Sequence, residues 1–589
     1  MTKAHWRGLR LGRLAAIYLG LACAGVLMLG ADPASWAQAP SKTKAPPKGS
    51  TAPLVVAPGQ VPVPTDEVTK FINTYFEKVW ADNKLQPSPI ASDYEFIRRA
   101  SLDIIGRIAK PAEIEAFLRD PPATRRAQLI DRLLNSEEYA RHWANLWTVW
   151  LMTRTGDPIH HEQLNMWLED HFAKGTSYKE IVEKLITATG ANNENGAVNF
   201  ILAHLGEPTP PAKRAEEGQF EMVPITSRIT RLFVGYQTQC TQCHNHPFNP
   251  EWTQQHFWGV NAFLRQIDAP QGGSRAPENR RDMAGPRLTL SDNPNYNKDG
   301  IVYYEKRSGV VLPTKPTFLD GRRIPADSKM TRRQALAQFV TSHENFAPAY
   351  INRMWGSFFG RGLNENPTVD DFGEHNKVVH PELLDFLAKA WTGSGAYDPR
   401  TLIRWICNSK PYHLSCQANA TNEKAEFEPF FSRMLLKSMS PEQLFESLMV
   451  ATQLDQSRDQ RRELRERWMR SLIVNFGDDE GNEVTFNGTV VQALLMINGR
   501  DLNSAVFSSS GTVANAMKKH GSNTRAIIDE LFLAALNRRA TNAEYNALVI
   551  GGPGQYAKLK MRVPDRDAAA PYQDLLWALL NCNEFILNH

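Results

Sequence analysis

The chain has 589 residues and a formal charge of +4, from 67 basic and 63 acidic side chains. This length is enough for roughly two to four domains, so folding requires neither a disulfide framework nor a structural metal. Four of the basic residues and one of the acidic residues lie in the first 39, and without them the charge falls to +1. A nearly neutral chain with no long basic run argues against nucleic acid as a main partner.

Residues 1–39 are typical of an export signal. Three arginines precede an uncharged apolar run over residues 14–31, and small residues suit cleavage after Ala37. The alternative is an uncleaved anchor, because a run of this length just reaches that of a membrane-spanning helix. We therefore expect an exported protein of the periplasm or cell envelope, with a membrane tether through this segment as the alternative to cleavage.

The rest of the chain is predicted to be mainly α. Residues 40–64 are rich in proline and lysine and form a flexible linker, whereas residues 65–266 show apolar side chains at helical spacing. Residues 267–330 form a second linker, in which β-branched and aromatic runs between 301 and 324 predict a β insert. Helical spacing resumes over residues 331–589. The predicted architecture is two helical domains with a small antiparallel β insert between them.

Capping residues mark several helix starts. Ser92 stands three residues before Glu95, Pro111 suits a first turn, and Ser136 precedes two glutamates. The helix after Ser136 carries five large apolar side chains nearly on one face: Trp143, Leu146, Trp147, Trp150 and Leu151. Such a stripe would suit a haem or carbohydrate site, but a core stripe is the commoner arrangement and is the interpretation we favour.

The most informative motif is Cys-x-x-Cys-His at residues 240–244. In this pattern Cys240 and Cys243 add to the vinyl groups of a haem, and His244 binds the iron from one side. Residues 225–239 have helical apolar spacing, so we expect the motif at a helix end, with its three reactive side chains on one face.

Other chemistries fit the same residues. Cys240, Cys243, His244 and His246 are ligands that zinc or copper accepts, so His246 is an alternative metal ligand. Outside the cytosol the two cysteines would also suit a short disulfide. The sequence does not identify the second ligand of a haem iron. By residue type alone there are four candidates: Met222, His256, Met283 and Met330.

Apolar side chains follow the motif at helical spacing: Phe257, Trp258, Val260, Phe263 and Leu264. They suit either packing on a macrocycle or closing the domain core. Of the remaining cysteines, Cys407 and Cys416 would pair or stay as buried free thiols, and Cys582 is unassigned.

The second half carries a group of charged residues: Arg353, Arg361, Asp370, Asp371, His380 and Glu382. Carboxylates beside histidine and arginine can perform acid–base chemistry. Buried ion pairs at helix ends explain the same residues, and we favour this structural interpretation because no nucleophile accompanies them.

The order of these motifs resembles a known family. Residues 66–265 are similar to the second planctomycete-type cytochrome c domain, and residues 331–587 resemble the planctomycete-specific domain that follows it. The matching stretches are Phe96 to Arg99 with Leu102 and Asp103, Thr230 to Phe248, Tyr350 to Leu363, His380 to Ala388, and the last 16 residues. The resemblance places Cys240, Cys243 and His244 at haem-attachment positions. The chain departs from the family pattern at Asn249 to Glu251, at His256 and at Cys582.

The sequence therefore predicts an exported c-type cytochrome-like protein with one covalently bound haem c. Its role would be electron transfer or another redox function with an unidentified redox partner or envelope component. The alternative is a cell-envelope scaffold or binding protein in which the motif forms a structural metal or disulfide site. A lesser alternative is an extracytoplasmic glycan hydrolase. No recognisable catalytic constellation is present.

Overall fold

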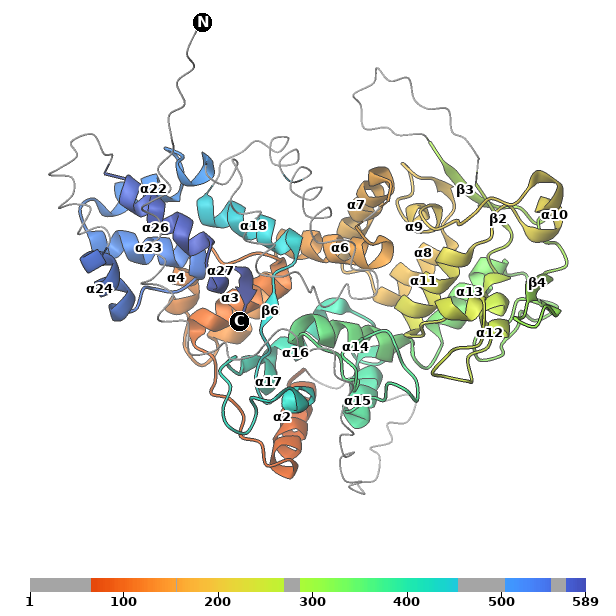
Figure 1. Ribbon diagram of the computed structural model, residues 1–589, viewed down its shortest axis with the longest axis horizontal. Coiled ribbons are helices and arrows are strands. Elements are labelled where there is room, and N and C mark those ends of the chain that lie inside the picture. Colours follow the sequence, from red (N-terminus) through yellow and green to blue (C-terminus); the bar gives the residue numbers. More distant parts are fainter. Residues whose placement is uncertain (1–64, 155, 270–286, 454–464, 466–503, 552–567) are drawn as a thin grey trace, which may run out of the picture.

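The computed structural model describes residues 65–154, 156–269, 287–453, 465, 504–551 and 568–589. The predicted export signal, the 40–64 linker and Met283 lie outside these residues. The described chain is mainly helical, as expected, and its strands form only small antiparallel sheets (Figure 1). No described helix is both long and apolar enough to cross a membrane.

Helices account for most of the first half. Ser92 accepts a hydrogen bond from the Glu95 amide and Ser136 one from the Tyr139 amide, which confirms two of the predicted starts. The helices are α2 (Thr65–Asp82), α3 (Asp93–Ile105), α4 (Pro111–Arg119), α5 (Arg125–Leu134), α6 (Glu137–Met152), α7 (Pro158–Lys174), α8 (Tyr178–Thr187), α9 (Val198–Leu202), α10 (Arg214–Glu217), α11 (Val223–Val234) and α12 (Gln254–Asn261), with 3-10 turns η3 (Pro211–Lys213) and η4 (Gln239–Gln242).

The strands form three small antiparallel sheets. In the predicted insert, β4 (Val302–Glu305) and β5 (Val311–Thr314) form an antiparallel hairpin with Tyr303 opposite Pro313. A sheet that the sequence did not predict has the order β1 (Gly190–Ala191), β3 (Thr289–Asp292), β2 (Ile267–Asp268). The third pairs β6 (Lys437–Ser438) with β7 (Leu587–Asn588), next to the C-terminus.

The second half is again helical. Thr331 begins α13 with a capping box completed by Gln334. The elements are α13 (Arg332–Thr341), α14 (Phe346–Phe359), α15 (Pro381–Thr392), α16 (Pro399–Asn408), α17 (Lys410–His413), η5 (Ala425–Phe430), α18 (Pro441–Thr452), α22 (Thr512–His520), α23 (Thr524–Leu536), α24 (Asn542–Gly551), α26 (Ala570–Leu580) and α27 (Asn583–Ile586).

Two hydrophobic clusters fill the interior, and each draws on both halves of the chain. The larger runs from α2 to the segment after η5 and includes Leu533 of α23. It places Phe76 of α2 against Trp355 of α14. The smaller joins α18, α22, α23, α26 and α27 to Leu102 of α3 and to Ile108. In Figure 1 the C-terminal helices gather at one end, α7 to α13 at the other, and α2 lies among α15 to α17 between them.

The tryptophan stripe of α6 belongs to the larger cluster. Trp143, Trp147 and Trp150 are all buried. The Trp147 ring lies 5.9 Å from that of Tyr350 on α14. These contacts confirm the core interpretation of the stripe.

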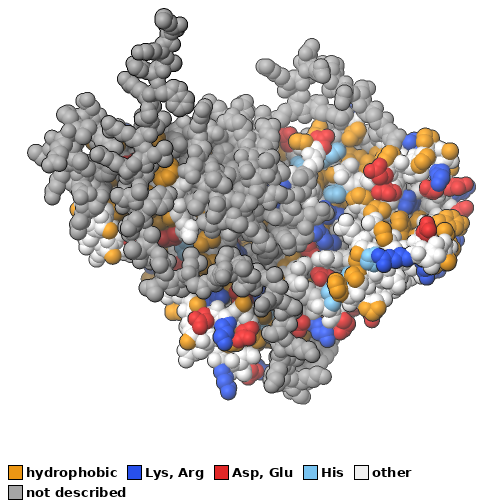
Figure 2. All heavy atoms as spheres, viewed as in Figure 1, with side chains coloured by type: hydrophobic (Ala, Val, Ile, Leu, Met, Phe, Trp, Pro, Cys, Tyr) orange, Lys and Arg blue, Asp and Glu red, His pale blue; other side chains and the backbone are white. Residues whose placement is uncertain are grey.

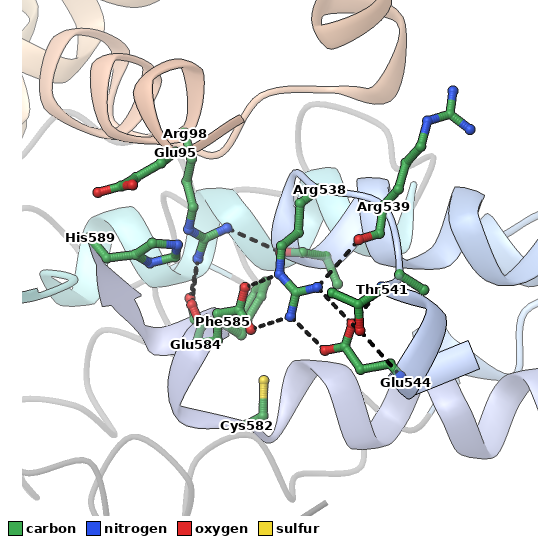
Figure 3. Close-up of polar contacts among 12 residues, drawn as sticks. Glu95, Arg98, Arg538, Arg539, Thr541, Glu544, Cys582, Glu584, Phe585 and His589 are labelled. Atoms are coloured by element: carbon green, nitrogen blue, oxygen red, sulfur yellow. Dashed lines mark hydrogen bonds and ion pairs between the residues drawn. The ribbon is translucent and has the colours of Figure 1, made fainter. Parts of the chain in front are cut away.

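Helix α3 connects the first half to the C-terminus through Arg98 (Figure 3). The buried guanidinium of Arg98 donates hydrogen bonds to backbone carbonyls of α23 and α27: those of Ala535, Glu584 and Phe585, at 3.2, 3.0 and 2.7 Å. Its neighbour Arg99 donates to the carbonyls of Tyr412 and Leu414. Asp103, on the same helix, accepts from Lys437 and Asn588 of the β6–β7 pair. The Phe96 to Asp103 stretch is therefore structural.

Candidate functional site

We predicted the Cys-x-x-Cys-His motif at the end of the upstream helix, but in the structure the helix ends before the motif begins. Helix α11 ends at Val234, because Gly235 adopts the left-handed conformation with φ of 71°. The Gly235 amide donates to the Arg231 carbonyl and the Tyr236 amide to the Thr230 carbonyl, which closes the helix in the manner of a glycine C-cap. The predicted helix over residues 225–239 is therefore five residues too long, and the motif lies in a separate turn.

That turn brings the three reactive residues together. The amides of Cys243 and His244 donate to the Cys240 carbonyl at 3.3 and 3.4 Å, so one tight turn carries all three side chains. Both thiols are free; Cys240 is half-buried and Cys243 exposed. Burial raises the pKa of the Cys240 thiol, and the nearby carboxylate of Asp371 raises it further.

The two histidines of the turn have opposite hydrogen-bonding roles. Nδ1 of His244 lies 2.6 Å from the Asn245 carbonyl oxygen. Since a carbonyl only accepts, Nδ1 carries the proton and Nε2 keeps its lone pair. Metal-bound histidines commonly have this arrangement, in which the second ring nitrogen donates to a carbonyl.

His246 is held the other way round. Its Nδ1 accepts hydrogen bonds from the amides of Phe248 and Asn249, at 3.3 and 3.0 Å. The Nδ1 lone pair is therefore in use and Nε2 carries the proton, so neither nitrogen is ready to bind a metal. Burial, with the neighbouring His375, lowers the pKa of His246. Among the residues that the structure describes, no group of three or more histidine, cysteine, aspartate or glutamate side chains is arranged to hold a metal ion. A zinc or copper site that includes His246 remains a prediction and would require the turn to rearrange.

The structure also places the predicted candidates for a second iron ligand. Met222 is buried at the N-terminal end of α11, whereas the motif follows the C-terminal end of that helix. Nδ1 of His256 accepts from the Thr253 amide at 3.1 Å, so its lone pair is engaged. Met330 lies in the segment before α13, with 36% of its surface exposed.

The apolar residues after the motif close the core. Phe257, Val260, Phe263 and Leu264 are buried. The half-buried Trp258 donates from its indole nitrogen to the Gln242 carbonyl at 3.1 Å, which ties α12 to the turn. Phe248, in contrast, is 71% exposed beside the motif.

A loop from the second half packs against the motif. The Phe372 amide donates to the Gly235 carbonyl at 2.8 Å, and the Phe372 ring occupies the space that a Cβ on Gly235 would need. Nearby, a Cβ on Gly373 would lie 3.1 Å from the side-chain nitrogen of Asn249. The surroundings of the motif are therefore built from both halves of the chain.

This loop brings His375 to the site, a residue that the sequence did not single out. Its Nε2 donates to the Asp371 carboxylate at 2.9 Å, and its ring centroid lies 5.3 Å from that of His246. Nδ1 of His375 is buried and has no hydrogen-bond partner in the structure. The Asp371-x-x-x-His375 spacing is visible in the sequence, but nothing in it indicates that the loop folds back onto residues 235–249.

The other charged residues of the second half do not gather at one point. Arg353 and Asp370 form a buried ion pair, and Arg361 donates to the carbonyls of Asn364 and Glu365. His380 is buried between the Tyr75 hydroxyl and the Pro429 carbonyl, while Glu382 is exposed. The contacts of Arg353, Asp370, Arg361 and His380 agree with the structural interpretation.

Comparison with known families follows the same division of the chain. Residues 71–269 match PSCyt2, a protein of unknown function (DUF1549), and residues 332–550 match PSD1, a protein of unknown function (DUF1553). The chain is a PSCyt2–PSD1 protein. PSCyt2 denotes a planctomycete cytochrome c domain of unknown function. No curated protein and no solved structure matches the chain. The candidate site therefore belongs to the PSCyt2 domain, and the loop carrying His375 belongs to PSD1.

Proposed function

We propose that this PSCyt2–PSD1 protein is an exported c-type cytochrome-like protein that carries one covalently attached haem. Cys240 and Cys243 would hold the macrocycle through thioether bonds, and His244 would bind the iron through Nε2. The observation that carries the proposal is the His244 hydrogen bond to the Asn245 carbonyl, at 2.6 Å, in the same turn as two free thiols. It leaves Nε2 with a lone pair where an iron ligand needs one.

The residues around the motif suit this group. The turn lies outside both hydrophobic clusters, so attachment does not require opening a core. Cys243 is exposed, and Phe248 presents an apolar ring next to the motif that a macrocycle would cover. When bound, a haem supplies one-electron redox chemistry. The chain itself would hold it, orient it and limit the access of water.

The position of the site supports a redox role. A macrocycle held by a surface turn has an edge close to solvent, which suits electron exchange with a redox partner or envelope component. The alternative that we keep is an envelope scaffold in which the same thiols bind zinc or copper, or close a disulfide. The engaged lone pair of His246 favours the haem proposal over a four-ligand metal site.

Expression in a host that matures c-type cytochromes tests the proposal. We expect covalent haem in the wild-type chain, and its loss or strong reduction in Cys240→Ala, Cys243→Ala and His244→Ala. Cys582→Ser is the matched control, because Cys582 packs against the smaller cluster and is expected to leave haem content unchanged. A wild-type chain without haem that binds zinc or copper, or that has a Cys240–Cys243 disulfide, would contradict the proposal.

A further inference from the structure

The outer face of the β4–β5 hairpin presents apolar side chains to solvent. The hairpin packs against α12, and Val302 and Tyr304 on its inner face are buried. On the outer face Tyr303 is 66% exposed and Val311 is 56% exposed, and Pro313 lies directly opposite Tyr303. An antiparallel sheet with one solvated face ordinarily has polar side chains on that face. Exposed apolar side chains that gather in this way indicate a surface that contacts another molecule.

Basic side chains surround this apolar group. Lys306 and Arg307 lie in the turn between the strands, and Lys315 directly follows β5. All three are exposed, as is Glu305 at the end of β4. None of the three cations forms an ion pair with a residue in the described part of the chain. The hairpin therefore has an excess of positive charge that no neighbouring carboxylate balances, which is complementary to an anionic partner.

The turn of the hairpin projects from the molecule. Every residue from 305 to 311 is exposed, and nothing lies within 4 Å of where a Cβ on Gly309 would be. The Lys306 amide donates to the Val310 carbonyl at 2.9 Å, and the Gly309 amide to the Lys306 carbonyl at 2.8 Å, which closes the turn. Figure 2 shows hydrophobic and charged side chains together at the edge of the molecule where Figure 1 labels β4.

The shape and size of this surface favour a lipid bilayer over a protein partner. A stable protein interface uses roughly 20–30 residues on each side, whereas this hairpin extends only over residues 302–314. A layer of lipid headgroups adapts to a narrow projecting turn. Apolar side chains can enter the boundary between headgroups and acyl chains while neighbouring cations contact the lipid phosphates.

We propose that the β4–β5 hairpin binds peripherally to a membrane surface that contains anionic phospholipid. Tyr303 and Val311 would enter the boundary of the acyl chains, and Lys306, Arg307 and Lys315 would contact headgroup phosphates. The proposal does not depend on haem, because the hairpin has its own fold and its own contacts with α12.

Binding through this hairpin would also hold the Cys-x-x-Cys-His turn close to the membrane. Nε2 of Gln254 donates to the Glu305 carbonyl of β4 at 3.0 Å and to the Gln242 carbonyl, between the two cysteines, at 3.3 Å. One side chain thus joins the hairpin to the motif. A redox partner embedded in the same membrane would meet the motif there.

Co-sedimentation with lipid vesicles tests the proposal. The processed chain, which begins at Gln38 after cleavage of the predicted signal, lacks the apolar run that could bind lipid by itself. It is mixed with vesicles of phosphatidylcholine alone or with about 30% phosphatidylglycerol. We expect binding to the anionic vesicles that weakens as salt is added, and little binding to the neutral vesicles.

Two double variants of the hairpin separate the contributions of charge and apolar contact. Lys306→Gln with Arg307→Gln should weaken binding to the anionic vesicles about 25-fold, at roughly fivefold for each cation. Tyr303→Ser with Val311→Ser should weaken it about tenfold or more, because less apolar surface leaves water. All four side chains are exposed, so both variants should unfold in urea at the wild-type midpoint.

Matched controls remove the same kinds of side chain elsewhere. Lys70→Gln with Lys78→Gln removes two exposed cations from α2, which Figure 1 places away from β4. Met166→Ser removes an apolar side chain that is 50% exposed on α7. Both controls should leave binding within about twofold of the wild type, because distant charges are screened by salt.

The proposal is overturned by a wild-type chain that does not bind the anionic vesicles or that binds neutral vesicles equally well. Binding that both hairpin variants retain in full overturns it too, since the lipid site would then lie elsewhere. A chain that binds no vesicle but forms a dimer, lost in Tyr303→Ser with Val311→Ser, would show that the hairpin is a protein interface instead. If one double variant does not fold, the other decides. Haem content enters none of these outcomes.

Discussion

At the scale of single residues, backbone groups decide which side chains are chemically available. His244 and His246 are two positions apart and both half-buried. One donates to a carbonyl and keeps a free lone pair on Nε2, whereas the other has its lone pair engaged by two amides. Residue type and spacing could not distinguish them, because the distinction arises only when the turn folds.

Gly235 is the residue on which the placement of the motif depends most directly. A side chain at this position meets two obstacles, a φ of 71° and the ring of Phe372. We predict that Gly235→Ala lowers the free energy of unfolding by roughly 2–4 kcal/mol, from backbone strain plus the overlap with that ring. The shift in the midpoint of urea unfolding measures this.

A second glycine, Gly309, allows the cost of backbone strain to be measured separately from the cost of overlap with a neighbouring ring. Gly309, in the β4–β5 turn, has a φ of 81° but nothing within 4 Å of where its Cβ would be. Gly309→Ala should therefore cost only about 1 kcal/mol. Equal effects of the two substitutions would show that overlap with the Phe372 ring adds nothing to the cost of a side chain at Gly235.

At the scale of elements, α3 connects parts of the chain that are hundreds of residues apart. Arg98 is fully buried, and its terminal nitrogens donate to backbone carbonyls, as Figure 3 shows for Phe585 and its neighbours. Burial lowers the pKa of Arg98 to about 10, so the guanidinium keeps its charge at neutral pH. A second arginine, Arg538, joins Glu544 to Glu584 on the same side.

Arg98→Ala is predicted to destabilise the protein strongly. It would leave the carbonyls of α23 and α27 without donors and open a cavity between α3 and the C-terminus. We expect a loss of roughly 3–5 kcal/mol, measured by urea unfolding.

The control for Arg98→Ala is Arg539→Ala, because the Arg539 side chain is 55% exposed and its contact with Asp529 is at 3.5 Å. This change should cost less than about 1 kcal/mol. A similarly small effect of Arg98→Ala would contradict the role that we give to α3.

Elements were predictable from the sequence where local signals decide. Ser92, Ser136 and Thr331 mark real helix starts, and the β-branched run after residue 301 forms a real hairpin. The overlong helix before the motif was avoidable, since Gly235 is a visible C-cap residue. The contact of His375 with the motif was not predictable, because it depends on how two distant segments pack.

At the scale of the whole molecule, the interior holds several histidines in the neutral form. His380 is an example: its Nε2 donates to the Pro429 carbonyl at 2.7 Å, and the Tyr75 hydroxyl donates to its Nδ1 at 3.0 Å. Burial lowers the pKa of His380 from 6.5 to about 4. His142, His204 and His413 are lowered to about 4 for the same first reason.

Because the pKa values of these histidines are lowered in the folded protein, we predict that the protein loses stability in mild acid. Between pH 6.5 and 4 the unfolded chain binds protons that the folded chain does not, so their contribution is complete above pH 6.5 and is lost as the pH falls. His380→Gln keeps both hydrogen bonds but does not titrate. Between pH 6.5 and 4 the unfolding free energy of the variant should therefore fall less than that of the wild type. The difference between the two falls should be about 3 kcal/mol at most. Identical pH profiles of the variant and the wild type, measured by urea unfolding, would contradict the neutral assignment of His380.

The central claim is that this PSCyt2–PSD1 protein carries a covalent haem on Cys240 and Cys243. The most direct test is the visible spectrum of the reduced pyridine complex of the purified chain, quantified against protein concentration. We predict a c-type spectrum at about one haem per chain that survives extraction with acidified organic solvent, as thioether attachment requires. A chain matured in a competent host that shows no such spectrum, or whose haem is removed by the extraction, would contradict the claim.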